Sequence, residues 1–262
     1  MDSLDESSGK EKRRKLTPSE DRFLEHGLEG FSGPEKIQLL LCHNLPRKEG
    51  EKLANEVSKR YKDLREFLTA PDQELEQIPG ITPSTLLCIK LMQEMPKAFL
   101  KEKIINKPVH KSSRDVFDYL YYSMRDLKKE VFKVVYIDSE NKIIDTQDLF
   151  EGTLDGIHIY PREIEAGAIK HNATGLIFVH NHPSGDPAPS WNDKQITRDL
   201  VFIGKVMNVK VVDHIIIGED NYFSFADEGL ITKYEDEFLN LRIRSLTLDK
   251  KLKHSKDSIQ LV

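Results

Sequence analysis

Two histidines, a serine and an aspartate stand close together in residues 180–193, which read His-Asn-His-Pro-Ser-Gly-Asp-Pro-Ala-Pro-Ser-Trp-Asn-Asp. His180 and His182 are one residue apart, and after seven further residues come Ser190, two spacers and Asp193. Neutral imidazole nitrogens and a carboxylate oxygen are good ligands for zinc. Three protein ligands leave a fourth position for water, whose pKa the metal lowers to about 7. The spacing therefore predicts a catalytic Zn²⁺ site formed by His180, His182 and Asp193.

The same segment also has a purely structural interpretation. Asn-His-Pro-Ser-Gly-Asp-Pro is rich in turn-forming residues, and Ser190 with Asp193 before a helix would serve as a variant capping box. The combination of two histidines and an aspartate, with Pro and Gly to fix the turn, favours the metal site. Capping is compatible with it, because a helix N-terminus stabilises a carboxylate. The segment lacks the His-Glu-x-x-His motif of many zinc peptidases, so the general base must lie elsewhere.

The surrounding residues predict the strands and helices that must position this segment. Helices are expected at 161–172 and 190–208, and a buried strand at 175–179 leads directly to His180. Further strands are predicted by β-branched and aromatic runs at 131–137, 143–144, 209–212, 214–217 and 222–225. This alternation predicts an α/β (α+β) domain over residues 110–235.

Residues 21–104 predict a separate all-α domain. Apolar residues such as Leu53, Val57 and Tyr61 recur there at helical spacing. Gly- or Pro-bearing breaks are expected at 30–34, 45–50 and 70–71, and a linker at 106–109. Residues 1–20 predict a disordered polar leader, in which acidic residues offset a Lys/Arg cluster at 10–15. Residues 236–262 predict a charged C-terminal tail.

The composition is that of a soluble protein. The 262 residues are 38% hydrophobic and 32% charged, and the net charge is -5, so nucleic-acid binding would need a local basic patch. No run approaches the roughly 18 apolar residues of a membrane span, and the first residues lack the apolar segment of a secretory signal. We therefore expect a cytoplasmic protein with no membrane partner. Cys42 and Cys88 are expected to be buried free thiols rather than a disulfide.

The motif His180-x-His182, seven residues, Ser190, two residues, Asp193 resembles that of the JAMM (MPN+) metalloproteases. The longer run His-Asn-His-Pro-Ser-Gly-Asp-Pro-x-Pro-Ser is similar to the RadC branch, whose members have long been labelled DNA repair proteins. The resemblance extends to residues 130–132, 160–163 and 213–218 and includes an N-terminal helical region. It implies a mixed sheet flanked by helices, of the cytidine-deaminase-like kind, and a zinc-dependent hydrolase.

The resemblance also implies roles for single residues. His180, His182 and Asp193 match the zinc ligands, and Ser190 matches the serine that steadies the oxyanion of a tetrahedral carbonyl. Glu130 stands where the family has its general base, which takes a proton from the attacking water and returns it to the leaving amine. Glu163 competes for the role of base because it is closer in sequence to the metal segment, but the family layout favours Glu130.

Two further features within the resemblance remain open. His214 follows Asp213 and matches a family position, so it either supports the site or is simply buried within a strand. Residues 75–83, Leu-Glu-Gln-Ile-Pro-Gly-Ile-Thr-Pro, resemble the hairpin of a helix-hairpin-helix DNA-binding unit, which favours Gly-x-Gly for close approach to phosphate. Thr82 replaces the second glycine, so DNA binding and a role in packing or protein docking are equally expected.

The leading functional hypothesis is a zinc-dependent peptidase or isopeptidase that acts on a peptide or protein substrate. The alternative is a DNA-associated repair or recombination accessory protein whose metal site acts on nucleic acid or is structural. A non-catalytic scaffold is disfavoured because all three metal ligands are intact.

Overall fold

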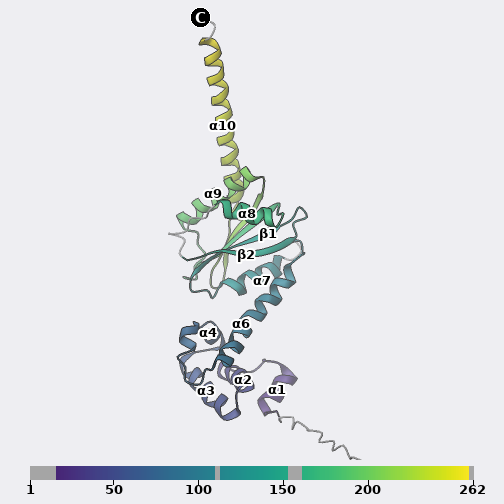
Figure 1. The fold of residues 1–262 in the computed structure, drawn as a ribbon, viewed down its shortest axis with the longest axis vertical. Coiled ribbons are helices and arrows are strands. Elements are labelled where there is room, and N and C mark those ends of the chain that lie inside the picture. The colour runs from purple at the N-terminus through teal and green to yellow at the C-terminus, as the bar shows by residue number, and fades with distance from the viewer. Residues whose placement is uncertain (1–15, 110–112, 153–160, 260–262) are drawn as a thin grey trace, which may run out of the picture. The chain divides into compact units, whose positions relative to one another are not determined.

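The structure is a computed structural model that describes residues 16–109, 113–152 and 161–259. The chain divides into two compact units between Glu94 and Met95. Figure 1 shows the helical first unit and the second unit with its sheet. The described chain is thus a mixed α/β protein with N-terminal helices, as the sequence predicts.

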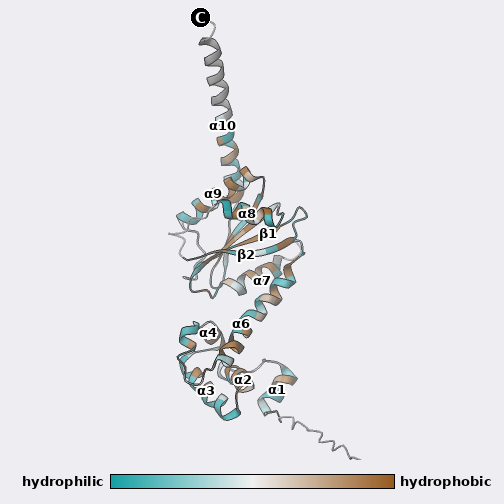
Figure 2. Cartoon of the chain, viewed as in Figure 1, coloured by the Kyte–Doolittle hydropathy of each residue, from teal (hydrophilic) through white to brown (hydrophobic). Residues whose placement is uncertain are grey.

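The first unit is built from short helices around an apolar core. Capping boxes start α1 and α2, because Thr17 with Glu20 and Ser32 with Glu35 satisfy each other's backbone N–H groups. Figure 2 shows α3 as largely hydrophilic, and its few apolar residues face the core. The helices are α1 Pro18–His26, α2 Gly33–Asn44, α3 Arg47–Arg60, α4 Leu64–Leu68, α5 Asp72–Leu75 and the first part of α6 Pro83–Ile104. The core residues are Ile37, Leu41, Leu53, Ala54, Val57, Tyr61, Phe67, Ala70, Leu75, Ile78 and Ile89.

The second unit contains a five-stranded mixed sheet in the order β2-β1-β3-β4-β5. β3 and β4 are parallel and are joined through α9, while the other neighbouring pairs are antiparallel. The strands are β1 Glu130–Ile137, β2 Ile143–Gly152, β3 Gly175–Asn181, β4 Lys210–Ile217 and β5 Tyr222–Ser224. The helices are α7 Ser113–Met124, α8 Pro161–Lys170, α9 Trp191–Met207 and α10 Leu230–Ile259.

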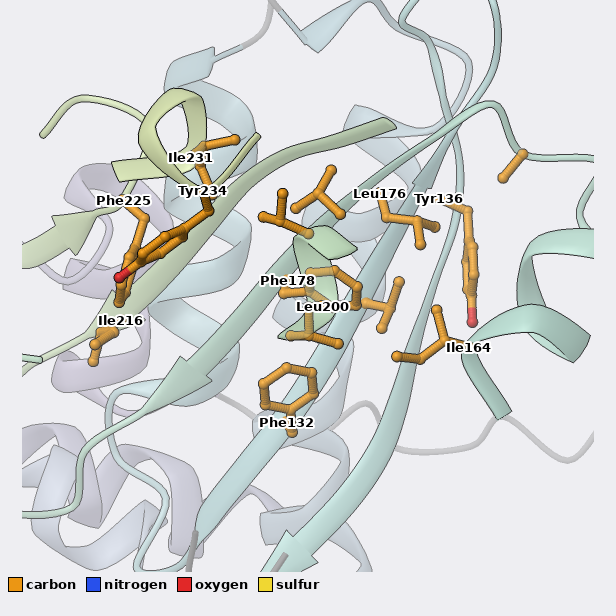
Figure 3. Close-up of a cluster of buried hydrophobic side chains, with 14 residues drawn as sticks. Phe132, Tyr136, Ile164, Leu176, Phe178, Leu200, Ile216, Phe225, Ile231 and Tyr234 are labelled. Atoms are coloured by element: carbon orange, nitrogen blue, oxygen red, sulfur yellow. The ribbon is translucent and has the colours of Figure 1, made fainter. Parts of the chain in front are cut away.

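Alternating side chains of the strands fill two apolar cores, one on each face of the sheet. On one face Phe132, Tyr136 and Phe178 pack with residues of α8, α9 and α10, as Figure 3 shows. On the other face Val135 and Ile177 pack with residues of α7 and the end of α6. Because β3 is covered on both sides, every one of its residues is buried.

Four boundaries differ from those expected. The helix α1 begins at Pro18, inside the range predicted as a leader, and residues 1–15 lie outside the described chain. The helix α10 continues to Ile259, through most of the range predicted as a charged tail. The predicted strands at 209–212 and 214–217 form a single strand, β4, with an irregularity beside Leu176 and Ile177 of β3. Arg47 to Gly50, predicted as part of a break, belong to α3.

Cys42 and Cys88 are free thiols, as predicted, although each is only partly buried. Within the ranges that the structure describes, none of the helices has the length and apolar character needed to cross a membrane.

Candidate metal centre

The predicted ligands meet where the end of β3 approaches the start of α9. β3 delivers His180 as a fully buried residue, and His182 follows the last residue of the strand. The backbone N–H of His182 donates to the carbonyl of Ile217, the last residue of β4, at 2.9 Å. Asp193 occupies the first turn of α9 and is 1% exposed. One donor atom from each of His180, His182 and Asp193 lies within 4.8 Å of the others.

The nitrogen–nitrogen distance, and the distance from each nitrogen to one of the two carboxylate oxygens, are close to the ligand spacing around a tetrahedral ion. His180 Nε2 lies 3.0 Å from His182 Nε2 and 3.3 Å from Asp193 Oδ1, and His182 Nε2 lies 3.5 Å from Asp193 Oδ2. Ligand atoms each roughly 2.0–2.1 Å from a tetrahedral zinc would be about 3.3–3.4 Å apart. The group could therefore hold a metal ion without rearrangement of its elements.

The hydrogen bonds around the group also point to a bound cation. His182 Nδ1 lies 2.7 Å from the carbonyl oxygen of Asp186, which can only accept, so Nδ1 carries a hydrogen and the neutral ring turns its Nε2 lone pair toward the site. Among the described residues, the buried Asp193 Oδ1 has no hydrogen-bond partner. A buried carboxylate oxygen without a donor is costly, and a metal ion at this point would satisfy it.

Electrostatics act differently on the three candidate ligands. Burial lowers the pKa of His180, although Asp193 and Glu130 act in the opposite direction. Burial also acts to lower the pKa of His182, but Asp193 and the Asp186 carbonyl bring it above its usual value. Burial acts to raise the pKa of Asp193, yet the two imidazoles hold it well below its usual range. Asp193 is therefore a carboxylate across the physiological pH range.

Ser190 is the N-cap of α9 and forms a capping box with Asp193. Its Oγ accepts the backbone N–H of Asp193 at 3.1 Å, and Asp193 Oδ2 accepts the backbone N–H of Ser190 at 2.7 Å. The capping and metal interpretations of this segment therefore coincide, because the cap orients the carboxylate. The exposed Ser190 side chain also hydrogen-bonds the Asp193 carboxylate and so helps to hold the pKa of Asp193 low.

The structure places the two candidate bases differently. Glu130 is the first residue of β1 and is partly buried, and its charge is among those that raise the pKa of both His180 and His182. β1 pairs with β3 so that Phe132 lies opposite His180, which brings the start of β1 to the ligand end of β3. Glu163 lies in the first turn of α8 and is exposed.

Asn181, between the two histidines, fixes the start of β1. Its Oδ1 accepts the backbone N–H of Val131 at 2.8 Å, and its Nδ2 donates to the carbonyls of Lys129 at 3.1 Å and Leu127 at 3.4 Å. Asn181 is fully buried. These bonds tie the residues on both sides of Glu130 to the strand that carries the ligands.

Sequence reasoning missed Asn181, and it also missed Thr197, a fully buried residue one turn after Asp193 in α9. Asparagine within a turn-forming run and threonine within a helix carry no distinctive local pattern. His214 is fully buried in β4 and lies against His180, with its Nε2 2.8 Å from His180 Nδ1. Burial lowers the pKa of His214 well below its usual value.

Comparison with known proteins agrees with this architecture. The family model "RadC-like JAB domain" matches residues 110–230, which include β1 to β5 and all the site residues named above. A UPF0758 protein of Trichlorobacter lovleyi is 36% identical over 214 residues, covering 80% of this chain and 93% of the relative. UPF0758 proteins of Pseudoalteromonas translucida and Fusobacterium nucleatum are each 34% identical, covering 80% of this chain and 94% of each relative. The chain therefore belongs to the RadC-like (UPF0758) family and carries that family's JAB domain.

Proposed function

We propose that this protein is a zinc-dependent hydrolase that cleaves an amide, either a peptide or an isopeptide bond, in a peptide or protein substrate. The observation that carries the proposal is the group formed by the buried His180 and Asp193 and the partly buried His182. One donor atom from each residue lies within 4.8 Å of the others, and one carboxylate oxygen lacks a hydrogen-bond partner among the described residues. When bound there, zinc would activate a water and polarise the substrate carbonyl.

The chain's own residues would supply the proton transfers. Glu130, at the start of β1, would take the proton of the attacking water and pass it to the nitrogen of the leaving amine. Ser190 would donate its hydroxyl hydrogen to the carbonyl oxygen as that oxygen gains negative charge. The capping box already holds the serine oxygen in place, so only its hydroxyl hydrogen would have to turn toward the substrate.

The test is Glu130→Gln in the full chain, with Glu163→Gln as the matched control. We expect Glu130→Gln to bind zinc as the wild type does but to lose cleavage of a fluorescence-quenched peptide library and of lysine-linked isopeptides. Glu163→Gln should retain both properties. Unchanged turnover in Glu130→Gln would reject the assignment of the base, and a wild-type chain that binds no zinc would reject the proposal as a whole.

A second candidate, a DNA-associated accessory role, is favoured by one feature of the first unit. The short helix α5 and the helix α6 are joined through Gly80, whose φ of +100° suits a tight hairpin. Against phosphate binding, Thr82 Oγ1 accepts the backbone N–H of Thr85 at 3.2 Å and so uses a donor at the start of α6. A duplex-DNA titration against salt separates the two candidates, because phosphate-dominated binding weakens steeply as salt rises. A slope near zero would reject the DNA role.

A further inference from the structure

A chain of hydrogen bonds links His180 to Asp193 through two residues outside the proposed ligand set. His180 Nδ1 lies 2.8 Å from His214 Nε2, and His214 Nδ1 lies 2.6 Å from Thr197 Oγ1. The Thr197 hydroxyl then donates to the backbone carbonyl of Asp193 at 2.5 Å. All four residues are at most 1% exposed, so bulk water does not compete for these bonds.

A β-bulge in β4 turns the His214 side chain toward these hydrogen-bond partners. Leu176 of β3 pairs with Val211, but Ile177 pairs with Asp213, so β4 has one extra residue at this point. Val211 and Ile216 contribute to the same core even though regular alternation would place them on opposite faces. The extra residue thereby places His214 on the face of the sheet that holds His180. Bulges often redirect a side chain next to a functional site.

Aromatic packing restricts the orientation of the His214 ring, so that its two nitrogens face His180 and Thr197. Phe225 stacks on it with ring centroids 5.1 Å apart, and Phe132 meets it edge-on at 5.5 Å. Aromatic rings therefore pack around His214, and both its nitrogens form the hydrogen bonds described above.

Only one arrangement of hydrogens forms all three of these hydrogen bonds while the His180 and His214 rings are both neutral. The Asp193 carbonyl can only accept, so it takes the single hydroxyl hydrogen of Thr197. His214 Nδ1 must then donate to Thr197 Oγ1, which leaves a lone pair on His214 Nε2. That lone pair accepts from His180 Nδ1, so the lone pair of His180 lies on Nε2, the atom that faces His182 and Asp193. The tautomers follow from this network of bonds.

We propose that Thr197 is a positioning residue which, acting through His214, fixes His180 in the tautomer that can bind a metal through Nε2. The inference rests on the proposed metal site. Without the Thr197 hydroxyl, the reverse tautomers of both histidines satisfy the His180–His214 hydrogen bond equally well. His180 would then present Nε2–H to the site for part of the time. Zinc binding would have to shift the His180 tautomer equilibrium, which would weaken the affinity for zinc.

Matched substitutions at one position test this role. Thr197→Val removes the hydroxyl at nearly constant volume, while Thr197→Ser retains it. We expect Thr197→Val to weaken zinc binding by the full chain about 10- to 100-fold, as other losses of hydrogen bonding to metal ligands do. Thr197→Ser should bind zinc close to the wild type. Zinc affinity is measured by competition with a chromophoric chelator.

Thr146→Val is the control for a purely structural effect. Thr146 of β2 is another buried threonine. Its hydroxyl lies 2.8 Å from the hydroxyl of Tyr119 in α7. Thr146→Val should lose stability in urea without changing zinc affinity. Should Thr197→Val not fold, the smaller Thr197→Ala is expected to show the same loss of affinity.

A measurement on the metal-free chain separates this inference from the proposed function. Ring ¹⁵N shifts should show His180 protonated on Nδ1 in the wild type and in Thr197→Ser, but a mixture of tautomers in Thr197→Val. Unchanged zinc affinity together with an unchanged His180 tautomer in Thr197→Val would overturn the role of Thr197. A wild-type chain with the expected tautomer but no zinc affinity would instead reject the metal site.

Discussion

At the scale of single residues, the candidate site includes side chains that hydrogen-bond the backbone as well as side chains that would bind a metal. Asn181 is an example, because its amide satisfies one N–H and two carbonyls of the segment that carries Glu130. Its neighbours His180 and His182 point their Nε2 atoms at each other. Residues 180–182 therefore supply two candidate ligands and the hydrogen bonds that fix the segment carrying the candidate base.

We expect Asn181→Ala to destabilise the second unit by about 1–3 kcal/mol, because it leaves the Val131 N–H and two carbonyls without their partner. Urea denaturation measures the loss, and hydrogen exchange should be faster at the Val131 amide. Asn55→Ala, at an exposed position of α3, should change stability by no more than about 0.5 kcal/mol. Equal effects of the two substitutions would show that the hydrogen bonds of Asn181 do not contribute to the free energy of unfolding.

At the scale of elements, the fit of α8 against β1 depends on the absence of a side chain. Gly167 of α8 faces Tyr136 of β1, and a Cβ at this position would collide with the tyrosine hydroxyl and lie 2.9 Å from its Cζ. Tyr136 is fully buried and stacks on His171 at 4.4 Å, so it has little room to move. Glycine in a helix interior costs about 0.5–1 kcal/mol relative to alanine, and here close packing outweighs that cost.

Gly167→Ala is therefore expected to destabilise the protein, because overpacking costs about 1–3 kcal/mol and exceeds the gain in helix propensity. Adding Tyr136→Phe removes the nearest atom and should recover part of the loss. Chemical denaturation of the two single variants and the double variant measures this coupling. The exposed Ala166→Ser in the same helix is the control. A stabilising Gly167→Ala would contradict the packing argument.

At the scale of the whole molecule, the two units have separate hydrophobic cores and only one contains the candidate metal site. A ligand stabilises the structure that binds it in proportion to the logarithm of its concentration relative to Kd. The protein's single tryptophan, Trp191, begins α9 two residues before Asp193. Its fluorescence therefore reports on the unit with the site.

Zinc at about 100 times its Kd should stabilise the second unit by about 2.7 kcal/mol against unfolding, as followed by Trp191 fluorescence. Hydrogen exchange of α2 and α3 in the first unit should change much less. Chelation should reverse the effect, and His182→Ala should abolish it. Equal protection of both units by zinc would mean that they unfold together rather than separately.

Much of the architecture could be predicted from local sequence patterns. The strands β1 and β3 are apolar runs bounded by turn residues, and the first unit has helical periodicity. The local pattern predicts two strands in place of β4 because Asp213 interrupts the apolar residues, but the structure shows one strand with a bulge there. The sequence does not predict the C-terminal part of α10, because charged residues dominate this segment and periodicity indicates a helix only where one face is apolar.

The sequence by itself determined the candidate ligand set, because His180, His182 and Asp193 lie within one strand–turn–helix segment whose local geometry brings them together. Only the tertiary structure decided what surrounds them. Thr197 and His214 meet because α9 packs beside β4, and Asn181 reaches Val131 across fifty residues because β1 and β3 pair in register. Such contacts depend on strand register and on one bulge, and a register shift of one residue would turn every side chain to the opposite face.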